Sequence, residues 1–138
     1  MATFVEMDIF SEDLAKKVHA LNAVDQCRWY LTNTLPVVTQ ATRSALPTEI
    51  TGGTGYTTNG LAVAITISRS GQTTTINAGA VTLTATGSVG PFRYAVLYND
   101  TPTSPADPCI GFYDRGSSLT MSATDTYAFP TGAIATIN

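Results

Sequence analysis

The chain has 138 residues, a length that fits one domain and allows enough burial to fold without a disulfide or a metal. Only 12% of the residues are charged and 43% are hydrophobic, which argues against disorder and favours association with other surfaces. The net charge is −3 and the seven basic residues are scattered, so the basic stripe of a nucleic-acid-binding protein is excluded.

The composition of the first residues predicts the cellular compartment in which the chain folds. The opening MATFVEMDIFSEDLAKK places four acidic residues where a signal peptide would have a positive region followed by an unbroken apolar core. No apolar run approaches the roughly 18 residues of a membrane span. We therefore expect a protein that folds and assembles in the cytoplasm without contacting a membrane.

One segment has helical spacing. Its apolar residues recur at intervals of four, four and three: Phe10, Leu14, Val18 and Leu21. Ser11 is the expected N-cap and Asn22 the expected end. The preceding residues, 4–9, form either an arm that attaches the protein to a partner or an edge strand. The sequence thus predicts an arm and helix over 1–24 and an all-β domain over 25–138.

After residue 25 the hydrophobic period is two, which is typical of strands. Predicted strands cover 27–31, 61–67, 73–76, 81–85, 90–100, 109–114, 119–122, 127–129 and 134–137, with turns at 70–71 and 115–117. Residues 37–59 are expected to be a long loop with one helical turn near 43–46. Seven to nine short antiparallel strands indicate a β-sandwich or barrel.

The segment GPFRYAVLYND, residues 90–100, is predicted to be a central strand because both of its alternating faces are apolar. Arg93 is the exception in this strand. An unpaired buried guanidinium is costly, so we expect a carboxylate or backbone carbonyls within hydrogen-bond reach of Arg93.

The sequence contains few residues that could be catalytic. His19 is the only histidine and is expected to be solvated near the end of the helix. Cys27 and Cys109 lack the spacing of a redox or zinc site, and we favour buried free thiols over a disulfide. The glycine-rich run GGTGYTTNG, residues 52–60, lacks the Gly-Lys-Ser/Thr of a phosphate-binding loop. We predict no enzyme, no catalytic or metal site and no cofactor.

Two binding hypotheses are weighed against simpler interpretations. Asp100, Asp107 and Asp114 flank one loop and its neighbouring strands, where they either hold a hard cation such as Ca²⁺ or form turns. A second group comprises aromatic residues that offer a sugar-stacking platform or belong to the core or an interface: Trp29, Tyr30, Tyr56, Phe112 and Tyr113. Tyr30 and Tyr56 are expected to be exposed.

Four stretches of the chain resemble a family of small virion proteins of tailed bacteriophages. They are MATFVEMDIFSEDLAKKVHALN at the start, LTNTLP at 31–36, GPFRYAVLYND at 90–100 and DPCIGFYDRGSSLTM at 107–121. The resemblance implies a capsid decoration, or cement, protein. Its implied fold is a β-sandwich of jelly-roll type, and its implied state is a homotrimer bound to the major capsid protein on the virion surface.

Two other functions remain open at this point. One is a virion component of the tail, neck or fibre that binds a host surface. The other is a carbohydrate-binding β-sandwich module. The number of copies in purified particles separates a shell protein from a neck or tail protein, and glycan soaking tests the third function.

Overall fold

A computed structural model describes residues 3–21 and 25–138 of the chain. The protein is all-β, with antiparallel strands and one short α-helix, as predicted. No helix within these residues is long and apolar enough to cross a membrane.

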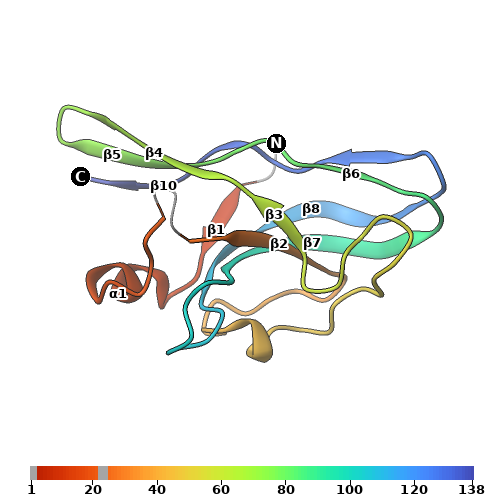
Figure 1. Cartoon of the computed structure of the whole chain (residues 1–138), viewed down its shortest axis with the longest axis horizontal. Coiled ribbons are helices and arrows are strands. Elements are labelled where there is room, and N and C mark those ends of the chain that lie inside the picture. The colour runs from red at the N-terminus through yellow and green to blue at the C-terminus, as the bar shows by residue number, and fades with distance from the viewer. Residues whose placement is uncertain (1–2, 22–24) are drawn as a thin grey trace.

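The described residues form ten strands rather than the seven to nine expected. They are β1 Phe4–Glu6, β2 Cys27–Thr32, β3 Leu61–Val63, β4 Ile65–Ser70, β5 Thr73–Ala78, β6 Thr82–Thr84, β7 Val89–Asn99, β8 Cys109–Met121, β9 Thr126–Ala128 and β10 Gly132–Ile137. A five-stranded sheet has the order β1-β8-β7-β2-β3, a three-stranded sheet the order β10-β5-β4, and β6 pairs with β9. Figure 1 shows these sheets as two layers, with the five-stranded sheet below the other two.

Strand β7 lies at the centre of the five-stranded sheet, as its sequence predicts. It pairs with β2 on one side and β8 on the other, and residues 94–99 are all buried. Gly90, the second residue of this strand, has φ +114, a conformation that other residues rarely adopt. A Cβ at this position would lie 2.6 Å from the carbonyl oxygen of Leu119, so only glycine fits there.

Strand β8 is continuous, so the predicted turn at residues 115–117 is wrong. Phe92 pairs with Leu119 and Tyr94 with Asp114, which leaves residues 115–118 opposite Arg93 alone. The extra residues form a bulge, in which Gly116 has φ +97 and its N–H donates to Asp114 Oδ1 at 2.7 Å. Gly116 thus does mark an irregularity in the backbone, but the chain bends there and does not reverse direction as a turn would require.

Helix α1 (Phe10–Ala15) is shorter than predicted, and Ser11 lies inside it rather than at its N-cap. It ends because Lys17 adopts a left-handed conformation, φ 61. Val18 N–H then donates to the Asp13 carbonyl at 2.9 Å and Lys17 N–H to the Leu14 carbonyl at 3.2 Å. This is a Schellman ending without glycine. The predicted end at Asn22 falls outside the described residues.

The N-terminal segment contains an edge strand, one of the two alternatives drawn from the sequence. β1 pairs antiparallel with β8, with Phe4 opposite Tyr113. Met7 follows with 1% of its surface exposed, and its N–H donates to the Ile110 carbonyl at 2.9 Å. The arm is therefore part of the five-stranded sheet.

The predicted strand 61–67 divides at Ala64 into two strands of different sheets. β3 pairs with β2 in the lower layer, and β4 pairs with β5 in the upper layer. The hairpin of β4 and β5 extends beyond the end of the lower sheet (Figure 1). Ile67 is consequently 43% exposed, although its alternation with Ile65 suggested burial.

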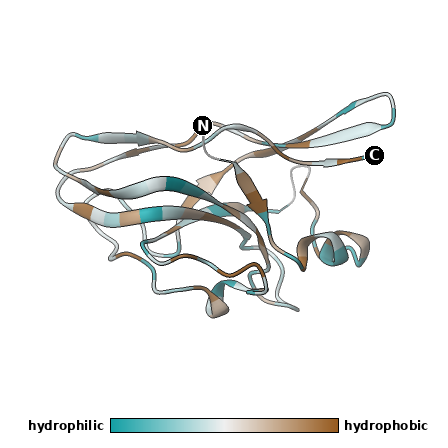
Figure 2. Ribbon diagram, turned by 180° about the vertical axis from the view of Figure 1, so that it is seen from behind, coloured by the Kyte–Doolittle hydropathy of each residue, from teal (hydrophilic) through white to brown (hydrophobic). Residues whose placement is uncertain are grey.

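The hydrophobic residues form two clusters, one on each face of the five-stranded sheet. The larger cluster fills the space between the layers and includes Trp29, Leu97 and Phe129. The smaller cluster includes Val96 and Tyr98 and is covered by the segment that contains the 3₁₀ turn Arg43–Ala45. Figure 2 shows hydrophobic segments in the strands of both layers and at the end of β10 beside the C-terminus.

Candidate functional site

The three aspartates considered as cation ligands do not act together, because each is paired with a different arginine. Asp100 accepts from Arg28 Nε at 2.8 Å, and Asp107 accepts from Arg43 at 3.0 and 3.2 Å. Asp114 accepts from Arg93. Within residues 3–21 and 25–138, no group of three or more His, Cys, Asp or Glu side chains could hold a metal ion. The structure thus gives the cation hypothesis no support.

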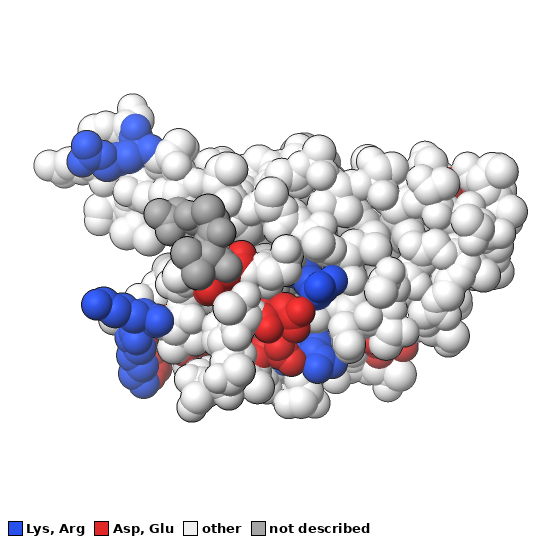
Figure 3. Space-filling view, viewed as in Figure 1, with Lys and Arg blue, Asp and Glu red and all other residues white. Residues whose placement is uncertain are grey.

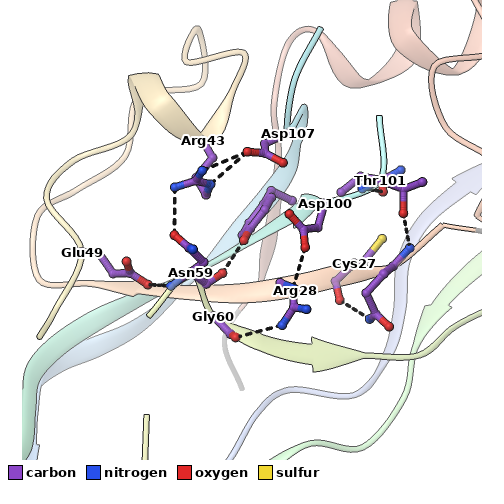
Figure 4. Close-up of polar contacts among 12 residues, drawn as sticks. Cys27, Arg28, Arg43, Glu49, Asn59, Gly60, Asp100, Thr101 and Asp107 are labelled. Carbon is purple, nitrogen blue, oxygen red and sulfur yellow. Dashed lines mark hydrogen bonds and ion pairs between the residues drawn. The ribbon is translucent and has the colours of Figure 1, made fainter. Parts of the chain in front are cut away.

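Arg43 is the centre of a polar network that fastens the long loop to the sheet (Figure 4). Besides Asp107, its guanidinium donates to Asn59 Oδ1 at 3.1 Å and lies 5.7 Å from the centre of the Tyr98 ring. The Tyr98 hydroxyl donates to the backbone carbonyl of Asn59. Burial raises the pKa of Tyr98 and keeps its phenol protonated.

Glu49 forms a second node of the same network. Its carboxylate accepts from the Tyr56 hydroxyl at 2.5 Å and from the backbone N–H of Asn59 at 2.8 Å. Tyr56 also accepts from the backbone N–H of Leu31 in β2 at 3.1 Å. Burial and the bond to Glu49 raise the pKa of Tyr56. Each of these polar groups is engaged within the protein, so the network holds the loop in place and offers no free acid or base.

His19 is buried, so the predicted solvated position is wrong. It is 8% exposed, its ring lies edge-on to Phe10 at 5.3 Å, and its Nδ1 lies 3.0 Å from the side-chain nitrogen of Asn99. That nitrogen also donates to Asp25 Oδ2 at 2.6 Å. Because the side-chain nitrogen of Asn99 can only donate, Nδ1 of His19 is the acceptor, carries no proton and leaves the imidazole neutral. Burial lowers its pKa to about 4.

The two cysteines are buried free thiols, as predicted. Cys27 and Cys109 are both fully buried, and they belong to the clusters on opposite faces of the sheet. Burial raises the pKa of each thiol to about 12. Neither thiol is therefore a nucleophile at neutral pH.

The five aromatic side chains considered for a sugar-stacking platform are buried, which favours the simpler interpretation that they belong to the core. Trp29, Tyr30, Tyr56, Phe112 and Tyr113 are each at most 5% exposed. Trp29 stacks on Phe129 with ring centres 5.7 Å apart. Tyr30 and Tyr56, expected at the surface, donate their hydroxyls to the Pro47 carbonyl and to Glu49. No ring of this group presents a face to a ligand.

A cavity of 460 Å³ lies beside β3 and the start of β4, lined by Leu21, Asp25, Gln26, Ala62, Val63, Ala64 and Ile65. Asp25 is the one ionisable residue of this lining. It already accepts from the Asn99 side chain and from the backbone N–H of Ala20 at 2.7 Å. The cavity therefore brings no reactive groups together.

The surface feature that the sequence analysis missed is the unequal distribution of charge between the layers. In residues 60–92 and 116–138, which include β4, β5, β6, β9 and β10, only Arg69 and Asp125 carry a charge. The blue and red side chains gather over the lower layer and around α1, and the upper layer is almost white (Figure 3). The charge-poor stretches are visible in the sequence, but their union in one layer depends on the topology.

In comparisons with known proteins, no protein family, no curated protein and no solved structure matches the chain.

Proposed function

We propose that this protein is a structural virion protein that decorates and stabilises the capsid shell of a tailed bacteriophage. In this proposal it binds the major capsid protein on the virion surface as a homotrimer with a jelly-roll sandwich. The resemblance of residues 1–22, 31–36, 90–100 and 107–121 to such proteins supports this role. The structure supplies a physical argument for an assembly function.

The observation that carries the proposal is the charge-poor upper layer. Protein interfaces are depleted of charged residues at their centres. Here the strands β4, β5 and β10 carry one charged residue, Arg69, although their faces also include exposed positions. When another protein covers such a layer, few charged side chains are removed from water, so the desolvation penalty is small. The lower layer differs, because three of its arginines are each paired with an aspartate.

A cement protein acts by binding the assembled shell better than its dissociated parts, which shifts the equilibrium toward the shell. Such a role requires a rigid fold with extensive contacts and no chemical step. The paired arginines and the fully engaged Arg43 and Glu49 network suit that requirement, because they hold the long loop of residues 37–59 in one conformation.

The experiment adds purified protein to capsids assembled without it. We expect saturable binding at hundreds of copies per shell and an increase in the temperature at which the shells break open. A protein present at a handful of copies per virion and unable to bind shells belongs to the neck or tail, and that result would refute the proposal. Binding of glycans with no binding of shells would equally refute it.

A further inference from the structure

The two layers leave two lateral edges on opposite sides of the molecule. Strand β3 is one outer strand of the lower sheet, and β4 follows it after Ala64 as an outer strand of the upper sheet. Strand β1 is the other outer strand of the lower sheet and contacts β10, the other outer strand of the upper sheet. We name these the β4 edge (residues 65–70) and the β1/β10 edge (residues 4–8 and 132–137).

Both edges carry unpaired backbone and exposed apolar side chains. Among the described residues, β4 and β10 pair only with β5, and β1 pairs only with β8. Ile67 is 43% exposed on the β4 edge, and Val5 and Ile137 are 37% and 48% exposed on the β1/β10 edge. Unpaired strand edges with apolar side chains are templates for contact with another chain.

The two edges carry charges of opposite sign. Arg69 is the single charged residue of β4, and Glu6 and Asp8 are the charged residues of the β1/β10 edge. All three are exposed. Within the described part of the chain their side chains form no hydrogen bond or ion pair, whereas Arg28, Arg43 and Arg93 are each paired with an aspartate.

We propose that the β4 edge of one copy docks on the β1/β10 edge of the next copy, with Arg69 facing Glu6 and Asp8. Opposite charges favour this head-to-tail contact, since a contact between two identical edges would place like charges together. Because the two surfaces differ, the contact is heterologous and repeats from copy to copy, and it gives the ring of the proposed homo-oligomer where the rotation between copies closes. The inference rests on the homo-oligomer of the proposed function and identifies the surfaces that form it.

The first test compares two apolar-to-acidic substitutions by sedimentation velocity at tens of micromolar protein. Ile67→Asp places a carboxylate in the contact, and the mass should fall from that of a ring to that of one copy. Leu35→Asp is the matched control, because Leu35 is 57% exposed but lies outside both edges. A wild-type chain that sediments as a single copy, or equal effects of the two substitutions, would overturn the inference.

The second test exchanges the charges. Arg69→Glu alone, and Glu6→Lys with Asp8→Lys, should each dissociate the ring by placing like charges together. The chain that carries all three substitutions should form the ring again, because the charges are opposite once more. Failure of this combined chain to regain the mass of the ring, while far-UV circular dichroism shows it folded, contradicts the pairing of these edges.

Binding to capsid shells, measured in parallel, separates this inference from the proposed function. If Ile67→Asp gives single copies that still bind shells, the edges form the ring and the shell contact lies elsewhere. If wild-type rings form through these edges but bind no shell, the capsid role is wrong and the ring contact stands. If both Ile67→Asp and Arg69→Glu still form the ring, these edges are not the interface, and this conclusion does not depend on the result for shell binding.

Discussion

Arg93 and Asp114 form a two-point ion pair between β7 and the bulge of β8, with Arg93 Nε 2.7 Å from Oδ1 and a terminal guanidinium nitrogen 3.0 Å from Oδ2. The position of Arg93 in an apolar strand predicted a partner, either a carboxylate or backbone carbonyls, and the partner is a carboxylate. The guanidinium also lies 5.4 Å from the centre of the Tyr94 ring. The pair thus fixes the four-residue bulge to the central strand.

The first prediction concerns the acid dependence of this pair. The hydrogen bond from Arg93 lowers the pKa of Asp114 below its ordinary value of 3.8. A lowered carboxyl pKa stabilises the fold above pH 4, and this stabilisation is lost as the pH falls through the folded-state pKa. Asp114→Asn should therefore reduce the free energy of unfolding slightly at pH 7, since both side chains are more than one third exposed. The difference from wild type should shrink below pH 4 in urea titrations; a constant difference down to pH 2 would contradict this account.

The second prediction concerns Arg43. Arg43→Ala leaves the partly buried carboxylate of Asp107 and the side-chain carbonyl of Asn59 without a donor. We expect the free energy of unfolding to fall by about 1–3 kcal/mol. Arg115→Ala is the control, because Arg115 is exposed and, among the described residues, its side chain bonds only with Ser117. Its effect should stay within about 0.5 kcal/mol. Equal losses in the two variants, measured by urea denaturation, would show that the Arg43 network does not hold the loop.

The third prediction concerns the effect of the buried His19 on the pH dependence of the free energy of unfolding. Burial lowers the pKa of His19 from 6.5 to about 4, so the unfolded chain binds its proton first as the pH falls. Stability should therefore decrease from pH 6.5 to pH 4 by about 1–3 kcal/mol, and this decrease should be absent in His19→Gln. The groups that face the imidazole are Asn99, Asp25 and the Phe10 ring.

The histidine prediction has a direct spectroscopic measurement. The imidazole C–H signals of the one histidine should titrate near pH 4 in the folded protein, and the same signals in urea should titrate near pH 6.5. A folded-state midpoint at 6.5 would mean that His19 is solvated, as the sequence had suggested.

The sequence predicted most strands because their alternation is a local property. The central strand β7 was identified because both of its faces are apolar in the sequence, and β2 because apolar residues at 27, 29 and 31 alternate with more polar ones. The 3₁₀ turn at Arg43–Ala45 and the turn after Ser70 were likewise predicted from short local stretches of the sequence. The division at Ala64 was missed because β3 and β4 have a continuous alternation and differ only in the sheet to which they pair.

The error at His19 and the unforeseen partners of the three aspartates have a different cause. A histidine near two lysines at the end of an amphipathic stretch reads as solvated, and only the fold brings Asn99 against it from 80 residues away. Similarly, the partners of Asp100, Asp107 and Asp114 lie 72, 64 and 21 residues away in the chain. Contacts between residues so far apart in the chain depend on the topology of the sheets, and the local spacing of residues in the sequence does not reveal that topology.

The last prediction tests whether β1 is an integral strand, and it uses the tight contact at Gly111. This glycine pairs with Glu6, and a Cβ at its position would lie 2.4 Å from the Phe4 ring and 2.4 Å from the Val5 carbonyl oxygen. Gly111→Ala must therefore push β1 away from β8, and we expect the free energy of unfolding to fall by about 1–3 kcal/mol.

Hydrogen exchange locates the effect of Gly111→Ala. The Met7 amide, which donates to Ile110, should exchange much faster in the variant, while amides of β2 and β7 lose only the protection that follows from the lower global stability. Val5→Ala is the control, since it trims a side chain that is 37% exposed without moving the backbone. If Gly111→Ala leaves both the stability and the Met7 exchange unchanged, β1 is not held against β8 in solution, and the N-terminal segment is an arm free to bind elsewhere.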